Sequence, residues 1–274
     1  MKRKLLEQVI FYGLLLGLWE ALVLVQVWPS YLFPSPLGVL RTIAGGLRDS
    51  SIPVAVGVSL RRIVIGYGIS IVAGIALGLL TGEFPLVGRT VGRLVLGLQT
   101  LPSICWLPLA MLWFGLNERA ISFVVIMGAL FSITIATEAG VKSVPRLFIN
   151  VGVNMGARRP GLFWYIILPA AMPHIVAGLR QGWSFAWRSL MAGEVVFMSL
   201  GLGQFLMMGR ELNDMNQVVA AMVIIATISI AVDKVIFGRL EAGLRRIKVG
   251  ASSLHERVRD RLAFGRKRLP DYEI

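Results

Sequence analysis

The sequence has very few of the residues that build redox, zinc or nucleophilic sites. Among its 274 residues there is one cysteine, Cys105, which cannot form a disulfide within the chain. The two histidines, His174 and His255, lie too far apart in sequence to indicate a zinc site. The phosphate-binding pattern Gly-x-x-x-x-Gly-Lys-Ser/Thr is absent, and nothing resembles a nucleophile with a positioned base. The sequence therefore predicts that the chain is not an enzyme.

Charged residues are also scarce. They make up 16% of the chain, against about 25% in a typical soluble domain, whereas hydrophobic residues make up 56% and the mean hydropathy is +0.74. This composition argues against a soluble globular enzyme. The net charge of +13 is compatible with nucleic-acid binding. However, the basic residues cluster between and beyond long apolar runs, which indicates that they flank membrane-spanning segments.

Six apolar stretches are long enough to cross a bilayer as helices, and they predict an all-α integral membrane protein with a six-span helical bundle. They cover residues 9–28, 63–82, 94–115, 120–137, 175–199 and 218–237. The first stretch is too long for the apolar part of a signal peptide, so we expect it to be retained as a helix.

The distribution of lysine and arginine predicts the orientation, because basic loops are retained in the cytoplasm. With the N-terminus inside, the inner segments hold nineteen basic residues, ten of them after residue 237, and the outer segments hold six. Both termini are then cytoplasmic. We expect an N-terminal helix with a periplasmic connection at 1–58, a transmembrane core at 59–238 and a basic, lipid-facing tail at 239–274.

Two patterns inside the spans predict special packing. A stripe of small residues recurs every fourth position in the second span, which indicates close approach of a neighbouring helix in this chain or another. The stripe consists of Gly66, Ser70, Gly74, Gly78 and Gly82. In the third span, Pro102 and Pro108 lie near the polar Gln99 and Ser103, which indicates either a broken helix beside a pathway or simple packing kinks.

Charged residues within a span need a partner or water, because each costs about 2.5 to 3.5 kcal/mol on the insertion scale. Arg180, Ser184 and Arg188 share one broad helical face of the fifth span, with Glu194 at its edge. These residues, with Gln99 and Ser103 of the third span, are candidates for a translocation pathway in which arginine offsets the charge of an oxyanion. The alternative is that neighbouring helices or a second subunit satisfy Arg188 and Glu194.

A polar stretch at 138–173 is long for a connection in a helical bundle. It contains Gly156, nine further residues, and then Ile166, Ile167, Leu168 and Pro169. This spacing resembles the later part of the cytoplasmic signature in permease subunits of binding-protein-dependent ABC importers. In that family the segment forms a short coupling helix that docks on the ATPase.

Further motifs extend the resemblance over roughly residues 31–240 and are similar to the nitrate, sulfonate, taurine and bicarbonate branch. They are Phe33-Pro34-Ser35-Pro36, Ser59-Leu60-Arg61-Arg62, Leu107-Pro108-Leu109, Trp113-Phe114-Gly115, Trp187-Arg188-Ser189-Leu190 with Glu194, Gly201-Leu202-Gly203 and Glu211-Leu212-Asn213-Asp214. Each motif is weak alone, and their common order and spacing carry the resemblance.

The resemblance implies a type I importer permease fold in the cell inner membrane. The partners it implies are cytoplasmic ATPases, a periplasmic or lipid-anchored binding protein and a second permease subunit, in a homodimer. It implies no cofactor on this chain, because ATP and magnesium are used by the ATPase, and no nucleic acid. The implied cargo is a sulfonate, taurine, nitrate or bicarbonate, with a thiamine-precursor pyrimidine as the alternative. A channel, a secondary transporter or an intramembrane enzyme is less favoured.

One departure from the family pattern affects the expected coupling loop. The family begins its signature with Glu-Ala-Ala, and Asn150-Val151-Gly152 occupies those positions here. We therefore expect docking to depend on the shape of the short helix, on close backbone approach at Gly156, and on the basic residues that follow it. The segment after the glycine begins with Ala157, Arg158 and Arg159.

Overall fold

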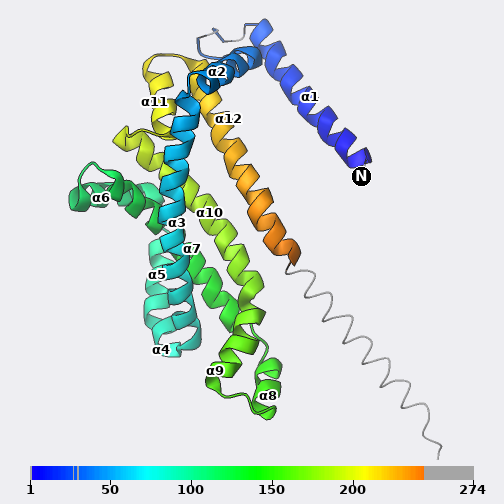
Figure 1. The fold of residues 1–274 in the computed structure, drawn as a ribbon, viewed down its shortest axis with the longest axis vertical. Helices are drawn as coiled ribbons and strands as arrows, with labels where there is room; N and C mark the ends of the chain where they lie inside the picture. Colours follow the sequence, from blue (N-terminus) through cyan, green and yellow to red (C-terminus); the bar gives the residue numbers. More distant parts are fainter. Residues whose placement is uncertain (1, 27, 30, 244–274) are drawn as a thin grey trace, which may run out of the picture.

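The computed structural model describes residues 2–26, 28, 29 and 31–243, and every regular element in this part of the chain is helical (Figure 1). The predicted basic tail lies outside these residues from position 244 onward. The long helices are α1 (Lys2–Leu24), α2 (Pro36–Arg48), α3 (Ser51–Glu83), α7 (Glu118–Lys142), α10 (Leu168–Phe197), α11 (Leu202–Glu211) and α12 (Met215–Val232). The shorter elements are α4 (Pro85–Val87), η1 (Gly88–Gly92), α5 (Arg93–Gln99), η2 (Ser103–Trp106), α6 (Leu107–Phe114), α8 (Arg146–Asn154), α9 (Arg159–Leu162), η3 (Phe163–Ile167) and η4 (Asp233–Phe237).

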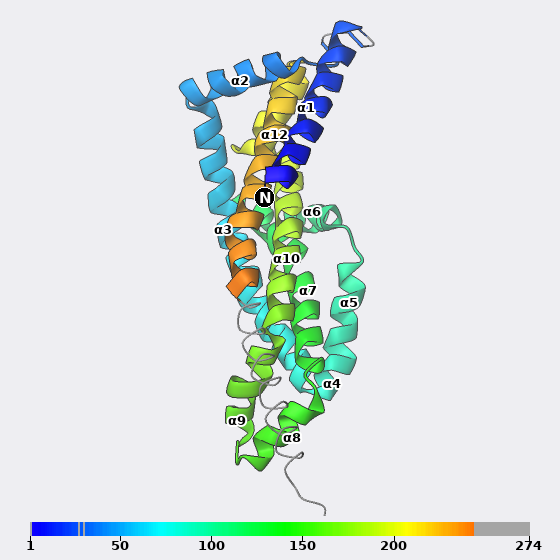
Figure 2. The same ribbon diagram turned by 90° about the vertical axis from the view of Figure 1, so that its right-hand side faces the viewer.

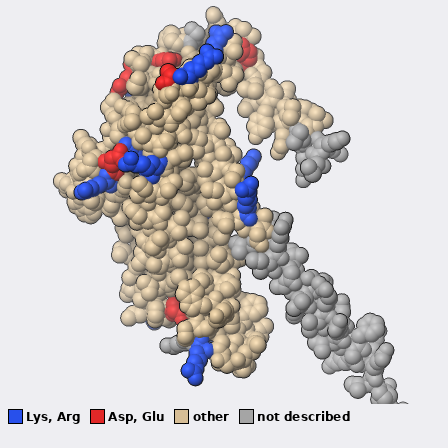
Figure 3. Space-filling model, in the orientation of Figure 1, with Lys and Arg blue, Asp and Glu red and all other residues tan. Residues whose placement is uncertain are grey.

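Five helical stretches are long and apolar enough to cross a membrane, and a bent pair of helices adds a sixth. The all-helical, multi-span architecture expected from the sequence is therefore confirmed. On the face shown in Figure 3, charged side chains are few and gathered in separate groups, with wide uncharged surface between them. Such a surface suits contact with lipid rather than with water.

The elements define two ends of an elongated molecule (Figure 1). α2 and α11 lie at one end, which we call the α2 end, and α8 and α9 lie at the other, the α8 end. α1 leans away from the bundle and is joined to the α2 end through a hydrogen bond from Trp19 Nε1 to the carbonyl oxygen of Pro34, at 3.0 Å. Side-chain caps fix the starts of α2, α7 and α12, where Ser35, Asn117 and Asp214 accept backbone N–H groups.

The third predicted span is broken rather than continuous. The stretches Pro85–Gln99 and Ser103–Phe114 meet at an angle of 103°, so α6 projects sideways from the bundle (Figure 1). The break lies at Pro102, just after the end of α5. Proline has no backbone N–H and restricts the residue before it, so the helix cannot continue, and the short 3-10 turn η2 follows. Of the two readings of the prolines, the structure thus shows a broken helix.

Two helices are longer than the hydropathy pattern predicts. α3 begins at Ser51 rather than near residue 63, so Arg61 and Arg62 lie inside the helix instead of in an outer loop. Likewise, α7 continues to Lys142 and the π-helical turn η3 leads directly into α10, so the connection expected at 138–173 is mostly helical. α8 and α9 occupy what is left of this connection.

α7 is the central helix of the bundle and packs against both α3 and α10. Figure 2 shows it between α10 and α5. Gly66, Gly74, Gly78 and Gly82 of α3 face Val125, Ile133, Thr137 and Val141 of α7 in that order. Positions on both helices increase together, so α3 and α7 run parallel. The small-residue stripe therefore has its partner within this chain.

Ile133 shows how tight this packing is. Its side chain is fully buried and contacts Gly74 of α3 on one side and Gly182 of α10 on the other. A Cβ at either glycine would lie within 3 Å of Ile133 atoms. In a membrane this close approach replaces the hydrophobic effect as a source of helix association, because van der Waals contact and short hydrogen bonds then hold the helices.

We predict that Gly78→Leu destabilises the bundle, whereas Gly68→Leu on the same helix does not. A Cβ at position 78 would lie 2.5 Å from Thr137 Cβ and 2.6 Å from the Thr134 carbonyl oxygen, and the backbone cannot move aside. Nothing lies within 4 Å of a Cβ at position 68. Overpacking should cost about 1–3 kcal/mol, measured as a lower unfolding midpoint in detergent. Equal midpoints for the two variants would contradict this account of the stripe.

Candidate functional site

The break between α5 and α6 opens a cavity beside α7 and α10. Its volume is about 260 Å³. The polar lining comes from Gln99, Thr100, Ser103 and Arg188, and the apolar lining from Leu101, Pro102, Trp106, Met127, Gly128, Phe131 and Phe185. Three of the residues predicted to line a pathway, Gln99, Ser103 and Arg188, thus lie around one cavity although they come from two distant parts of the sequence.

Arg188 is an exposed cation at this cavity. Its Nε atom donates to the Ser184 carbonyl oxygen at 3.2 Å, and its guanidinium carbon lies 4.8 Å from the centre of the Phe185 ring. No carboxylate of the described residues forms an ion pair with Arg188. The remaining N–H groups of the guanidinium are therefore available to an anionic ligand, in a lining that brings no counter-charge.

Glu194 was a candidate for lining the pathway, but in the structure it is fully buried inside the protein. Both of its carboxylate oxygens lie 2.8 Å from Ser59 Oγ, and it also accepts the Gly203 backbone N–H at 2.9 Å. Arg62 Nη1 donates to Glu194 Oε1 at 2.9 Å. The structure thus favours the alternative role for Glu194, in which neighbouring elements satisfy the charge and fix the assembly of helices.

Arg62 is the residue of this cluster that the sequence reasoning missed. It is 3% exposed, its Nη1 also donates to the Leu200 carbonyl oxygen at 2.6 Å, and its Nη2 donates to Glu118 Oε1 at 2.7 Å. Arg62 therefore joins α3 to the start of α7 and to the turn after α10. A signal was present, because Arg62 and Glu194 belong to two of the motifs that carry the resemblance, but the hydropathy pattern placed Arg62 in a loop.

The turn at residues 200–203 wraps closely around the Glu194 carboxylate. Gly201 has φ = +158°, and a Cβ there would lie 2.5 Å from Glu194 Oε1. A Cβ at Gly203 would lie 2.4 Å from Glu194 Cβ. Ser59 Oγ also accepts the Leu202 backbone N–H at 2.9 Å. Three separate sequence motifs, at 59–62, at 194 and at 201–203, thus form one buried polar cluster.

Arg180 is held by acidic residues and does not face the cavity beside α5. Its Nε and Nη2 donate to the two carboxylate oxygens of Asp233 at 2.6 Å, and its Nη1 donates to Glu241 at 3.0 Å. This bidentate ion pair ties α10 to η4 and the continuation of α12. Ser184, one turn further along α10, is exposed, and its hydroxyl lies 3.5 Å from the Arg180 carbonyl oxygen.

The predicted coupling segment forms α8 and the turn that follows it at the α8 end of the molecule (Figure 1). Asn150 and Val151 lie on the outward face of α8 and are exposed. Gly152 is buried on the opposite face, where a Cβ would lie 2.2 Å from Ile166 and 2.9 Å from Leu162. Glycine at position 152 therefore lets α8 approach the helical turn that starts α10.

Gly156 ends α8 in a left-handed conformation, with φ = +85°. Its N–H donates to the Val153 carbonyl oxygen and the Ala157 N–H donates to the Gly152 carbonyl oxygen, a pair of bonds typical of a Schellman motif. Nothing in the described chain lies within 4 Å of a Cβ at Gly156. Within this chain the close backbone approach is made by Gly152, and Gly156 determines how α8 ends. Close approach of a partner ATPase at Gly156 stays a prediction.

Apolar side chains are unusually exposed on α8. Leu147, Phe148 and Val151 have 46–68% of their surface accessible, and Met155 has 83%. Arg158 is also exposed, just after the turn, and Leu168 and Pro169 begin α10. An apolar helix face with a cationic residue beside it, on a short helix at one end of a membrane bundle, has the properties of a docking surface.

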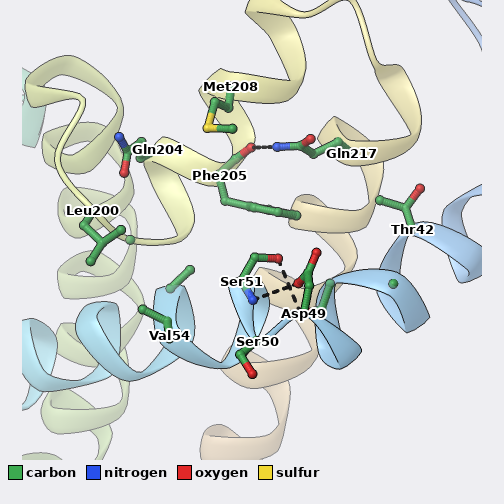
Figure 4. Close-up of a pocket in the computed structure, with 14 residues that line it drawn as sticks. Thr42, Asp49, Ser50, Ser51, Val54, Leu200, Gln204, Phe205, Met208 and Gln217 are labelled. Atoms are coloured by element: carbon green, nitrogen blue, oxygen red, sulfur yellow. Dashed lines mark hydrogen bonds between the residues drawn. The ribbon is translucent and has the colours of Figure 1, made fainter.

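A second cavity, of about 600 Å³, lies at the α2 end between α2, α3, α11 and α12 (Figure 4). Phe205 and Met208 line it from α11, and Gln217 Nε2 donates to the Phe205 carbonyl oxygen at 2.8 Å. Asp49 lies at its edge and accepts the Ser51 backbone N–H at 2.9 Å, which holds the pKa of Asp49 below its usual value. With no cation among its lining residues, this cavity lacks the electrostatic character of the cavity at Arg188.

We predict that Arg62→Met destabilises the protein much more than Arg61→Met. Removing Arg62 leaves the Glu194 carboxylate buried without its counter-charge, which should cost about 3–5 kcal/mol. Arg61 is 73% exposed and lies 3.5 Å from Glu118, so its loss should cost about 1 kcal/mol or less. Unfolding in detergent measures both. Adding Glu194→Gln to Arg62→Met should recover part of the loss, and no recovery would contradict the assigned charge pairing.

Comparison with known proteins identifies the family to which this chain belongs. Residues 70–246 match the model of the family described as binding-protein-dependent transport system inner membrane component. A putative ABC transporter permease protein of Methanocaldococcus jannaschii is 34% identical over 198 residues, which cover 72% of each chain. The taurine transport system permease protein of Escherichia coli is 29% identical over 90% of this chain and 88% of its own length. The nitrate import permease protein of Synechocystis is 27% identical, with coverages of 85% and 87%.

The fold agrees with this assignment. An inward-facing structure of the MetNI methionine ABC transporter superimposes with a TM-score of 0.53 at 18% identity, covering 66% of this chain and 92% of the matched chain. The family match, the relatives and the shared helical fold agree with each other. The chain therefore belongs to the family of inner membrane components of binding-protein-dependent transport systems, as a multi-pass permease subunit of an ABC importer.

Proposed function

We propose that this permease subunit forms half of a translocation pathway for a small anion, and that Arg188 contacts the anion during passage. The observation that carries the proposal is an arginine without a carboxylate partner among the described residues, at a cavity formed by a broken helix. The relatives are named for taurine, nitrate and bicarbonate, and each of these solutes carries an anionic group. A guanidinium can form paired hydrogen bonds with such oxyanions.

The energy source in this proposal is a partner ATPase that docks on α8. The apolar side chains exposed on α8 would fill a cleft on the ATPase, and movement of the ATPase would be transmitted through Gly152 and Ile166 to α10. Because α10 also carries Arg188, a shift of this helix changes the cavity. Coupling of this kind needs two arrangements of the helices that the nucleotide state of the ATPase favours differently.

The proposed orientation places the α8 end and both termini in the cytoplasm of the cell, and the α2 end outside. The support is the excess of basic residues in the segments on the α8 side. A binding protein would then deliver solute at the α2 end.

We further propose that a second copy of the chain completes the pathway, since a bundle with five or six crossing helices has wide apolar faces left for a partner subunit and lipid.

The pathway role of Arg188 predicts a loss of transport without a loss of assembly. Arg188→Gln should lower uptake roughly tenfold, because a hydrogen bond to a charged group contributes about 1.5–3 kcal/mol. Arg188→Lys keeps the positive charge and should retain more activity. The measurement is uptake of the ligand of the cognate binding protein into vesicles containing the reconstituted complex. Normal uptake by an assembled Arg188→Gln complex would overturn the proposed role.

The coupling role of α8 predicts different outcomes for two substitutions at Gly156. Valine cannot adopt φ = +85° without strain, so Gly156→Val should disturb the end of α8, whereas Gly156→Asn should be tolerated because asparagine adopts the left-handed region more readily. Binding-protein-stimulated ATP hydrolysis should fall several-fold for valine and little for asparagine. If the two variants were equally impaired, the backbone conformation would not be the reason for the glycine.

A further inference from the structure

A third cavity, of about 670 Å³, lies near the α8 end and shares its two walls with the cavity at Arg188. On α7, the cavity at Arg188 is lined by Gly128 and Phe131, and the third cavity by Ile135, Glu138 and Lys142. These positions follow one another in steps of three and four residues, so they lie along one face of α7. The two cavities are successive parts of the surface between the same helices.

The opposite wall shows the same continuity. Arg89 of η1 and Arg93 and Leu96 of α5 line the third cavity, and Gln99, one turn further along α5, lines the cavity at Arg188. The steps of four, three and three residues again select a single helical face. We call the surface between these two faces the α5–α7 groove. It extends from the cavity at Arg188, a residue of α10, to Arg89 of η1.

The part of the α5–α7 groove that forms the third cavity, which we call the lower groove, is strongly cationic. Its lining includes three basic side chains, Arg89, Arg93 and Lys142, and one carboxylate, Glu138. Lys142 forms an ion pair with Glu138. Arg89 Nε donates to the Pro85 carbonyl oxygen at 3.3 Å, and within the described residues neither Arg89 nor Arg93 has an acidic partner. The two arginines therefore produce a positive potential that no carboxylate of the described residues neutralises by an ion pair.

Glycine residues keep this cationic space open. Gly88 and Gly92 lie in the π-helical turn η1, on the wall that faces α7. A Cβ at Gly88 would lie 2.5 Å from the Thr81 carbonyl oxygen and 3.3 Å from Lys142 Nζ, and one at Gly92 would lie 3.1 Å from Glu138 Oε2. A larger residue at position 88 would therefore clash with the α3 backbone and contact Lys142, and one at position 92 would press on Glu138. π-helical turns of this kind are frequent at functional sites.

We propose that the lower α5–α7 groove is a second anion-binding site, which receives the transported anion after it leaves Arg188. This inference rests on the proposed function, because it assumes that Arg188 contacts the anion. Arg93 and Arg89 supply the cationic contacts and the groove supplies the route. The headgroup of an acidic lipid offers the same chemistry to this site, so the test must separate a soluble anion from a lipid.

The test measures the electrostatic potential in the groove directly. Leu96 lines the third cavity and is 58% exposed, so Leu96→Cys in a Cys105→Ala background provides one reactive thiol there. Rates of modification by negatively and positively charged methanethiosulfonate reagents are compared in the complete importer complex, reconstituted in phosphatidylcholine vesicles. A positive groove accelerates the negative reagent relative to the positive one.

Arg93→Gln should lower the ratio of the two rates by at least about threefold, even with screening by salt. Arg239→Gln is the matched control, because it removes one positive charge from the continuation of α12, outside the lining of the groove. It should leave the ratio unchanged. Arg93→Lys keeps the charge and should preserve the ratio, which separates electrostatics from local misfolding. An unchanged ratio in Arg93→Gln would overturn the proposal.

Occupancy by a soluble anion is tested by protection. Nitrate and methanesulfonate, each compared with gluconate at equal ionic strength, should slow the modification at least about twofold once half of the sites are filled. The effect should be the same with and without phosphatidylglycerol in the vesicles. Protection by phosphatidylglycerol alone would overturn the proposal in favour of a lipid site. Because these rates do not require transport, that result would leave the role of Arg188 to be judged by its own uptake measurement.

Discussion

Close contact of α3 and α10 with the two sides of α7 is the constraint on which the rest of the structure depends. Ile133 lies between Gly74 and Gly182, and a Cβ at either glycine would overlap it. This contact fixes the distance between three helices and therefore the places where side chains of one can reach another. The cavity at Arg188 lies between α7, α10 and the break after α5, so its shape follows from the same packing.

The helical architecture could be predicted from the sequence because long apolar runs and small-residue spacing are local signals. The stripe from Gly66 to Gly82 indicated a close helix partner, and Pro102 and Pro108 indicated either a break or packing kinks, of which the structure shows a break. Helix boundaries were less predictable where charges occurred inside a helix. Arg62 was placed in a loop because an isolated arginine is unfavourable in a span, and its acidic partners come from positions 118 and 194. Hydropathy contains no information about such distant partners.

The candidate site was predictable in part for the same reason. Gln99, Ser103 and Arg188 were identified as polar groups in apolar surroundings, and they lie at one cavity. Arg180 and Glu194 gave the same sequence signal, yet Arg180 is paired with Asp233 and Glu194 is buried with Arg62. A charge in a span thus indicates that a partner is required. Whether the partner is a solute or another side chain depends on the three-dimensional arrangement.

The buried cluster at Glu194 also restricts how the sequence can diverge. Ser59 and Arg62 are far along the chain from Glu194, Gly201 and Gly203, but each of these residues fills or borders the space of another. A side chain at position 201 would meet the carboxylate, and a neutral residue at position 62 would leave it unpaired. Substitutions at these five positions are therefore coupled. A homologue that differs at one of them should carry a compensating change at another.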